Sequence, residues 1–336
     1  MSDVNSQPIV VGVSEDGQSE GALRFAVDEA IRQRCNLTII HALSQSLPPP
    51  PPPGDPLIGY GRQDYGRQDE KFRFFADRSE SAAADRLVTD VARRARAMSR
   101  GRVAVDTDIP VGRRVHAIIE AAGNARLIVL QHRDLPAFER IFVHSTSIGV
   151  SARARCPVVT VPPVWESDLH HCRITVAIDD IENSAAVLRV AFECAMRRVA
   201  RIDVVHAWRF TGAEADICAS RDLAKDWEAR SKETFEKALA PWQREFPQVK
   251  VEQHLVQQSI VDALLERSRG SDLLILGRFR ASLPLPFPLG SIARAMVNGA
   301  HCPVEIVPHG ASTTSKPTSG TDERHRRRIE YENEVN

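Results

Sequence analysis

Residues 8–30 read PIVVGVSEDGQSEGALRFAVDEA, an apolar run followed by a polar turn and then by apolar residues at helical spacing. The chain repeats the pattern as RITVAIDDIENSAAVLRVAFECA at residues 173–195, which aligns Ser19 with Ser184 at an offset of 165 positions. A short apolar run is typical of a buried strand, and the 3.6-residue period after it is typical of a helix that packs on that strand. The sequence therefore contains the same strand–turn–helix unit twice.

The remainder of the chain repeats in the same order. NLTIIHALS at 36–44 matches RIDVVHAWR at 201–209 with the same offset. RARCPVVTVP at 153–162 matches GAHCPVEIVP at 299–308, but here the offset is 146 positions. The first copy therefore carries a net insertion of 19 residues, which the proline-rich segment 47–70 supplies. A repeat that keeps the order of its elements indicates two domains of one fold.

Apolar runs and helical periods alternate throughout both copies. We expect strands near residues 8–13, 37–43, 103–107, 126–130, 157–161, 173–178, 202–208, 249–255, 272–276 and 303–307. We expect helices near residues 19–34, 75–99, 113–123, 146–154, 184–198, 220–244, 259–269 and 291–298. This alternation predicts parallel sheets covered on both faces, and right-handed crossovers favour the doubly wound order. The expected fold class is α/β, with two tandem, doubly wound, five-stranded parallel-sheet domains of Rossmann type.

The repeat also predicts the domain organisation. The first domain spans residues 1–164 and carries the proline-rich insertion at about 45–72. The second domain spans residues 165–310. The tail at 311–336 is rich in polar and charged residues, so we expect it to be disordered.

Composition narrows the function further. The 336 residues include 44 basic and 44 acidic ones, so bulk charge gives no reason to expect binding to nucleic acid. The apolar runs are strand-sized, far below the roughly 20 residues that span a bilayer, so we expect no membrane insertion. The start shows no signal-peptide pattern, and the six cysteines form no CxxC pair. We therefore expect a cytoplasmic protein with reduced thiols and no metal site.

A loop after the fourth strand of the second copy has the features of an anion site. Residues 277–291 read GRFRASLPLPFPLGS, and a helical pattern begins at about Ile292. Ligands in doubly wound sheets bind beyond the carboxyl ends of the strands. A helix N-terminus offers unpaired N–H groups to phosphate. Gly277 and Gly290 would allow close backbone approach, and Ser291 would add a hydroxyl donor.

With this repeat and this loop, the chain resembles the universal stress proteins of bacteria, with the family domain present twice. The resemblance covers nearly all of residues 8–309 and implies the adenine nucleotide alpha hydrolase-like form of the fold. The family's ATP-binding pattern is G-x-x-G, nine residues, then G-S or G-T. The second copy fits this pattern with Gly277, Gly290 and Ser291, and has Arg280 at the second glycine.

The resemblance also implies roles for residues near the strand ends of the second copy. Asp179 would meet the ribose and adenine side of the nucleotide. Ala177 and Ile178 would lie beside the base. Ala207 and the backbone near Leu276 would line the adenine pocket.

The first copy departs further from the family pattern. Its corresponding residues are Gln131, Asp134, His144 and Ser145, so all three glycines are absent. The acid after the first strand is replaced by Ser14, although Asp16 stands two residues later. Asp134 would place negative charge where phosphate should lie. We therefore expect the phosphate site of the first copy to be lost.

The residues leave two interpretations of the second-copy loop open. Arg280 either clashes with a phosphate or pairs with it through its guanidinium. The three prolines at 284, 286 and 288 stiffen the loop and remove three amide donors. In the alternative interpretation, Gly277 ends a strand and the Gly290–Ser291 pair caps a helix, without any ligand.

The resemblance implies a nucleotide-responsive regulator of stress or dormancy adaptation that is not an enzyme. ATP or a related adenine nucleotide would be held in the second domain without being required. The alternative is a nucleotide-free scaffold for an unknown protein partner. A slow ATPase is a third alternative, although the chain has no Walker lysine.

The last strands of the two copies predict how the domains associate. Domains of this family pair through the last strand, and VVTVPP at 158–163 and VEIVPH at 304–309 suit such pairing. We therefore expect an intramolecular domain pair, with a homodimer as a further alternative.

Overall fold

The computed structural model describes residues 7–14, 19–44, 78–132, 145–163, 165–178, 184–207, 221–256, 259–278 and 289–308. The expectations for the proline-rich insertion and for the C-terminal tail concern residues outside these ranges. The domain boundary expected after residue 164 lies between the last strand of the first copy and the first strand of the second. It stays a prediction.

The first copy forms the elements that its periodicity predicts. Its main elements are β1 (Ile9–Gly12), α1 (Glu20–Gln33), β2 (Leu37–Ile40), α2 (Arg78–Ser99), β4 (Val105–Asp108), α3 (Arg114–Ala121), β6 (Leu127–Gln131), α4 (Thr146–Arg153) and β7 (Val158–Val161). A separate ribbon of two short strands, β3 (Leu43–Ser44) and β5 (Val111–Gly112), was not expected. It arises because the chain leaves the main sheet after β2, where one continuous strand was predicted.

The second copy repeats this order. Its elements are β8 (Arg173–Ala177), α5 (Ala185–Arg198), β9 (Arg201–Ala207), α7 (Arg221–Glu245), β10 (Val251–Val256), α8 (Ile260–Ser268), β11 (Leu273–Gly277), α9 (Ser291–Gly299) and β12 (Val304–Val307). Helix α5 occupies the place of α1, and α9 occupies the place of α4, as the alignment of the two copies requires.

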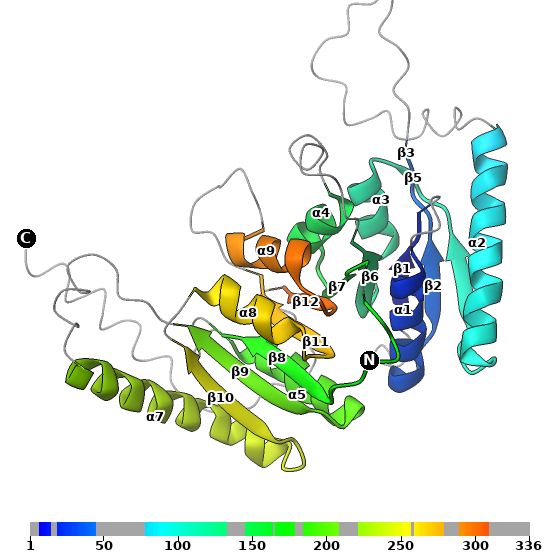
Figure 1. Ribbon diagram of the computed structural model, residues 1–336. Coiled ribbons are helices and arrows are strands. Elements are labelled where there is room, and N and C mark those ends of the chain that lie inside the picture. The colour runs from blue at the N-terminus through cyan, green and yellow to red at the C-terminus, as the bar shows by residue number, and fades with distance from the viewer. Residues whose placement is uncertain are drawn as a thin grey trace, which may run out of the picture.

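The ten main strands form a single sheet, in the order β10-β9-β8-β11-β12-β7-β6-β1-β2-β4 (Figure 1). Each half has its first strand in the middle, and neighbouring strands within a half are parallel. This is the doubly wound order, so the expected fold class is confirmed. The two halves meet where β12 pairs with β7 in the antiparallel direction, which confirms the expected pairing of the last strands.

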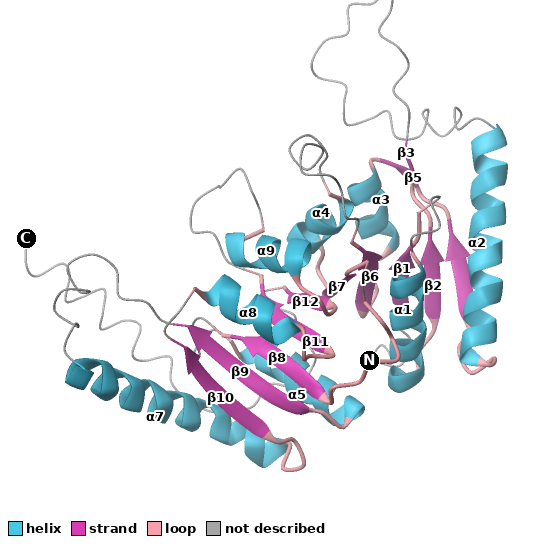
Figure 2. Cartoon of the chain, in the orientation of Figure 1, coloured by secondary structure: helices cyan, strands magenta, loops and turns pink. Residues whose placement is uncertain are grey.

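Helices cover both faces of the sheet (Figure 2). Side chains of α1, α2, α5 and α7 share one apolar core that extends across both copies. On the opposite face, α3 and α4 form one core, and α8 and α9 form another. Burial on both faces explains why the strands read as uninterrupted apolar runs.

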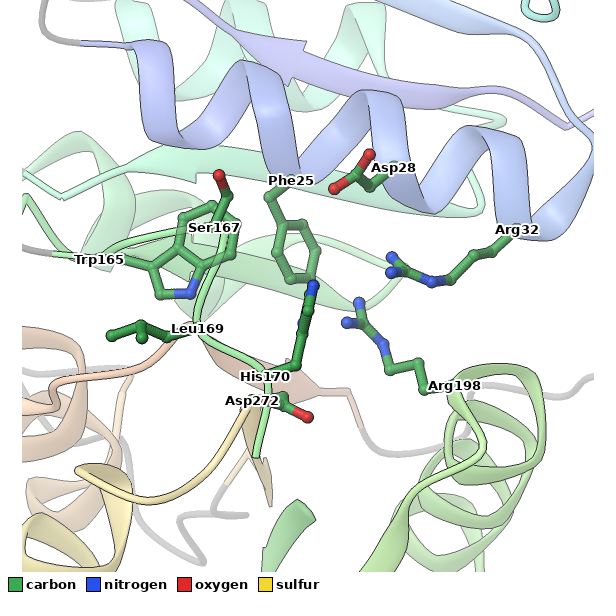
Figure 3. A pocket seen from close by; sticks show the side chains of 9 residues that line it. All are labelled: Phe25, Asp28, Arg32, Trp165, Ser167, Leu169, His170, Arg198 and Asp272. Atoms are coloured by element: carbon green, nitrogen blue, oxygen red, sulfur yellow. The ribbon is translucent and has the colours of Figure 1, made fainter. Parts of the chain in front are cut away.

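Helices α1 and α5 meet at the seam between the two copies (Figure 3). Glu29 of α1 accepts a hydrogen bond from Arg198 of α5 at 2.7 Å, and both side chains are at least nine-tenths buried. The Arg198 guanidinium also lies 5.1 Å from the centre of the Phe25 ring. Trp165, in the segment that joins the copies, packs edge-on against Phe25 at 5.8 Å. Apolar and ionic contacts therefore hold the two halves together.

Candidate functional site

The structure brings the candidate residues of the second copy to one edge of the sheet. Ala177, Ala207 and Gly277 are the last residues of β8, β9 and β11. Leu276 lies beside Ala177 in the register of β11 and β8. Ile178 follows β8 and is 2% exposed, so it belongs to the floor of this edge. Because the strands are parallel, these carboxyl ends line the crevice where doubly wound sheets bind ligands.

The N-terminus of helix α9 lies on the side of these strand ends, because the helix follows β11 in the chain and packs against β12. Gly290 is its N-cap residue, with φ −57° and ψ 157°. Ser291 is the exposed first residue of the helix, and Ile292 follows it. No side chain of the described residues caps this N-terminus. Its first-turn N–H groups can therefore donate to an anion.

Two of the predicted site residues, Asp179 and Arg280, lie outside the described residues. The same holds for Asp134 and His144 of the first copy. Their roles stay predictions.

A histidine at the end of the second strand holds the end of the first strand in both copies. His206 Nδ1 donates to the carbonyl oxygen of Ile178 at 2.9 Å, and His41 Nδ1 donates to that of Val13 at 3.0 Å. A carbonyl only accepts, so the proton lies on Nδ1 in each case. The His206 ring also packs against Phe235, with 4.9 Å between ring centres. These histidines are structural, and His206 orients the backbone of Ile178.

The first copy fills the corresponding space with its own side chain. Gln131 Oε1 accepts the backbone N–H of Ala22, in the first turn of α1, at 2.8 Å. Gln131 Nε2 donates to the carbonyl of Val161 at 2.9 Å. In the second copy the same position is Gly277, and a Cβ there would lie 3.2 Å from Val187 Cγ2. The glycine thus has no side chain to make the two bonds that the glutamine makes, and Val187 of α5 lies close to the place that a Cβ would take.

The turn after β1 differs from its counterpart in a second way. Ser14 stands where the second copy has Asp179. The backbone N–H of Ser14 donates to Ser19 Oγ at 3.0 Å, and the two hydroxyl oxygens lie 3.1 Å apart. Within the described residues of this turn, the hydroxyl groups of Ser14 and Ser19 lie against each other.

A cluster of charged residues beneath α8 has the spacing of a metal site but a different character. Asp203, Glu252 and His254 place ligand atoms within 4.8 Å of one another. The Asp203 carboxylate, however, is 1% exposed and lies 3.3 to 3.9 Å from three guanidinium groups, those of Arg173, Arg201 and Arg267. These cations already balance its charge, and burial together with Arg267 lowers the pKa of His254. The cluster is an ion-pair network.

Four further residues, two histidines and two cysteines, carry side chains of types that can react or bind metal. His170 and His171 are exposed. Cys302 is buried, and burial raises the pKa of its thiol. Cys156 is half-buried rather than buried, and burial raises its pKa to about 11. Both thiols are protonated at neutral pH and are poor nucleophiles. Within the described residues, no helix combines the length and the apolarity that a membrane crossing requires.

Comparison with known proteins places this chain in a family. The model of the universal stress protein family matches residues 5–162 and again residues 172–308. A universal stress protein of Mycolicibacterium smegmatis is 26% identical over 301 residues, which cover 89% of this chain and 96% of that protein. Universal stress protein Rv2005c of Mycobacterium tuberculosis is 26% identical over 304 residues, with the same coverage.

Solved structures agree on the fold. The crystal structure of a universal stress protein from Archaeoglobus fulgidus covers 91% of this chain and 98% of its own, with a TM-score of 0.64 at 16% identity. Its span includes both halves of the ten-stranded sheet. The chain belongs to the universal stress protein family and carries the family's domain twice in tandem.

Proposed function

We propose that this protein is an adenine-nucleotide-responsive regulator of stress or dormancy adaptation, which holds ATP in its second copy and not in its first. The observation that carries the proposal is the contrast between Gly277 and Gln131. The glycine leaves the end of β11 free of a side chain, whereas the glutamine amide occupies the end of β6 and binds α1. The two equivalent strand ends therefore differ, because one carries a hydrogen-bonded amide side chain and the other carries none.

In the proposed complex, the nucleotide lies across the carboxyl edge of the second copy. The adenine ring would rest on Ala177 and Ile178, with Ala207 and the Leu276 backbone at its edges. The phosphates would meet backbone N–H groups at the start of α9 and at the end of β11. These groups belong to Gly277, Gly290, Ser291 and Ile292. Asp179 for the ribose and Arg280 for a phosphate complete the proposed set.

The proposed regulation would take place in the cytoplasm and would need ATP binding but no ATP hydrolysis. ATP that binds one arrangement of the two copies better than another shifts the population toward that arrangement, by its difference in affinity. The single sheet makes such a shift felt in both halves, because β12 and β7 are hydrogen-bonded neighbours. Protein partners that bind one arrangement of the copies in preference to the other would therefore respond to nucleotide.

A nucleotide-free scaffold is the second candidate, and one observation favours it. The copies share an apolar core and a continuous sheet, and nothing in this packing requires a ligand. In that case both crevices would be remnants, and partners would bind the protein whether or not nucleotide is present.

Equilibrium dialysis with labelled ATP separates the two candidates. We expect saturable binding to the wild type and binding at least about tenfold weaker in Gly290→Val, whose side chain would block the phosphate approach. The backbone angles of Gly290 are open to any residue, so the variant should fold. Absence of saturable binding at millimolar ATP would favour the scaffold. Phosphate release above that of Gly290→Val would instead indicate an ATPase.

A further inference from the structure

Arg278, the residue after Gly277, is attached to both copies. Its backbone N–H donates to the carbonyl of Val307 at 2.8 Å, which holds it against the end of β12. Its side chain crosses to the first copy, where Nη1 donates to the carbonyl oxygens of Ala152 at 3.1 Å and Ala154 at 2.8 Å. One side chain therefore links the end of β11 to helix α4.

The two acceptors belong to the C-terminal turn of α4, which ends at Arg153 with Ala154 as its C-cap. The last carbonyls of a helix have no donor within the helix, and this end of the helix dipole attracts a cation. Burial lowers the pKa of the half-buried Arg278 guanidinium. The guanidinium is cationic, so both bonds to the carbonyls are charge-assisted.

Helix α4 is well placed to respond to the second copy. Ile148 and Ala152 of α4 pack into the apolar core that Leu274 and Met296 help to form beneath α8 and α9. Helix α4 also contacts α9, the helix whose N-terminus would hold the phosphates. A first-copy helix thus packs against a helix and an apolar core of the second copy.

The long cationic side chain occurs at this position in one copy alone. The counterpart of Arg278 in the first copy is His132, whose backbone N–H repeats the bond to the neighbouring strand, to Val161 at 2.8 Å. The backbone hydrogen bond is therefore the same in both copies. The arginine that extends to α4, however, occurs in the second copy alone.

We propose that Arg278 couples nucleotide occupancy of the second copy to the C-terminal turn of α4 in the first. This inference rests on the proposed function, because the ligand is the adenine nucleotide placed there. A nucleotide bound against Leu276 and Gly277 restricts the backbone directly before Arg278. The direction of the Arg278 side chain, and with it the bonds to α4, depends on that backbone. Coupling is reciprocal, so the bonds to α4 also strengthen nucleotide binding.

Hydrogen exchange of the intact chain, with and without saturating ATP, tests the proposal. The reporter is the amide of Ala154, which bonds the carbonyl of Val150 at 2.8 Å in the last turn of α4. We expect ATP to slow this exchange at least about fivefold in the wild type. We expect no slowing in Arg278→Gln, and a partial response in Arg278→Lys, which keeps the charge but not the planar donors.

Arg153→Gln is the matched control, because Arg153 donates to the Gly149 carbonyl within α4 at 3.2 Å and is exposed. It should keep the full response. An Arg278 with a merely structural role would give faster exchange in Arg278→Gln without ATP but an unchanged response to ATP, and that result would overturn the proposal. Dialysis of the wild type is read separately. ATP that binds without slowing α4 exchange refutes the coupling alone, whereas ATP that does not bind refutes both the coupling and the proposed function.

Discussion

Glu305 of β12 lies directly opposite Val159 of β7 in the antiparallel register, and these two residues occupy the same position in their respective copies, 146 residues apart. The pseudo-twofold axis that relates the two copies therefore passes between these two residues. The first copy places an apolar side chain at this central point, and the second copy places a carboxyl group that is 7% exposed. The seam of the molecule is thus symmetric in its backbone and asymmetric in its charge.

Glu305→Gln should change how stability depends on pH. Burial, with the charge of Glu29 adding to it, raises the pKa of Glu305 from 4.5 to about 7, against the effect of Arg197 and Arg198. Between these two pH values the folded protein holds a proton that the unfolded chain has released. Stability is therefore lost as pH rises through this window, by about 3 kcal/mol in all.

The Glu305→Gln variant has no carboxyl group at this position, so it lacks this loss of stability with rising pH. Urea unfolding from pH 4.5 to pH 8 should show the free energy of unfolding of Glu305→Gln rising relative to the wild type as pH increases. Glu29 is present in both proteins, so its own titration largely cancels in the comparison. A constant difference across the range would show that Glu305 does not titrate in this window.

Arg198→Gln should destabilise the pairing of the copies. Burial alone would raise the pKa of Glu29, but Arg198 and the hydrogen bond from Gln33 outweigh it, and the pKa is lowered. Removal of Arg198 leaves a buried charge with a weaker partner in Arg197, at 3.9 Å. We expect a loss of about 3 kcal/mol in the free energy of unfolding at pH 7. The loss should diminish at acid pH, where Glu29 takes up a proton.

Lys237→Gln is the control for that loss. It breaks the exposed ion pair between Lys237 and Glu233, so the free energy of unfolding should change far less than it does in Arg198→Gln. Equal effects of the two substitutions would show that the seam pair contributes no more than a surface pair.

Gly277→Gln should transfer the closed state of the first copy to the second. The new Cβ would lie 3.2 Å from Val187, and the amide would reach toward the first turn of α5, as Gln131 reaches α1. We expect ATP binding at least about tenfold weaker, because the side chain occupies the place of the ligand. Dialysis measures this, and unchanged affinity would show that the ligand does not use this strand end.

Gln131→Ala should cost stability in the first copy without affecting ATP binding. The backbone N–H of Ala22 and the carbonyl of Val161 would each lose a hydrogen-bond partner in a partly buried site. We expect a loss of about 1 to 2 kcal/mol in the free energy of unfolding. A fall in ATP affinity would place the nucleotide in the first copy and contradict the assignment.

Periodicity and repetition were sufficient to predict most of the fold. The alignment of Ser19 with Ser184 located α1 and α5, and the last strands indicated how the copies pair. Strands β3 and β5 were missed because two residues carry no period. The polar contacts were also beyond prediction. Gln131 binds a residue 109 positions away, and Arg278 binds one 124 positions away. No local pattern specifies such approaches, since the packing of the elements creates them.

The stoichiometry of ATP binding, measured by native mass spectrometry of the intact chain, tests the central claim most directly. If ATP binds in the second copy and not in the first, each chain should hold a single ATP. This ATP should be lost in Gly290→Val and retained in Ser145→Val, which changes the first copy's counterpart of Ser291. Two ATP molecules per chain, none, or one that survives Gly290→Val would contradict the claim.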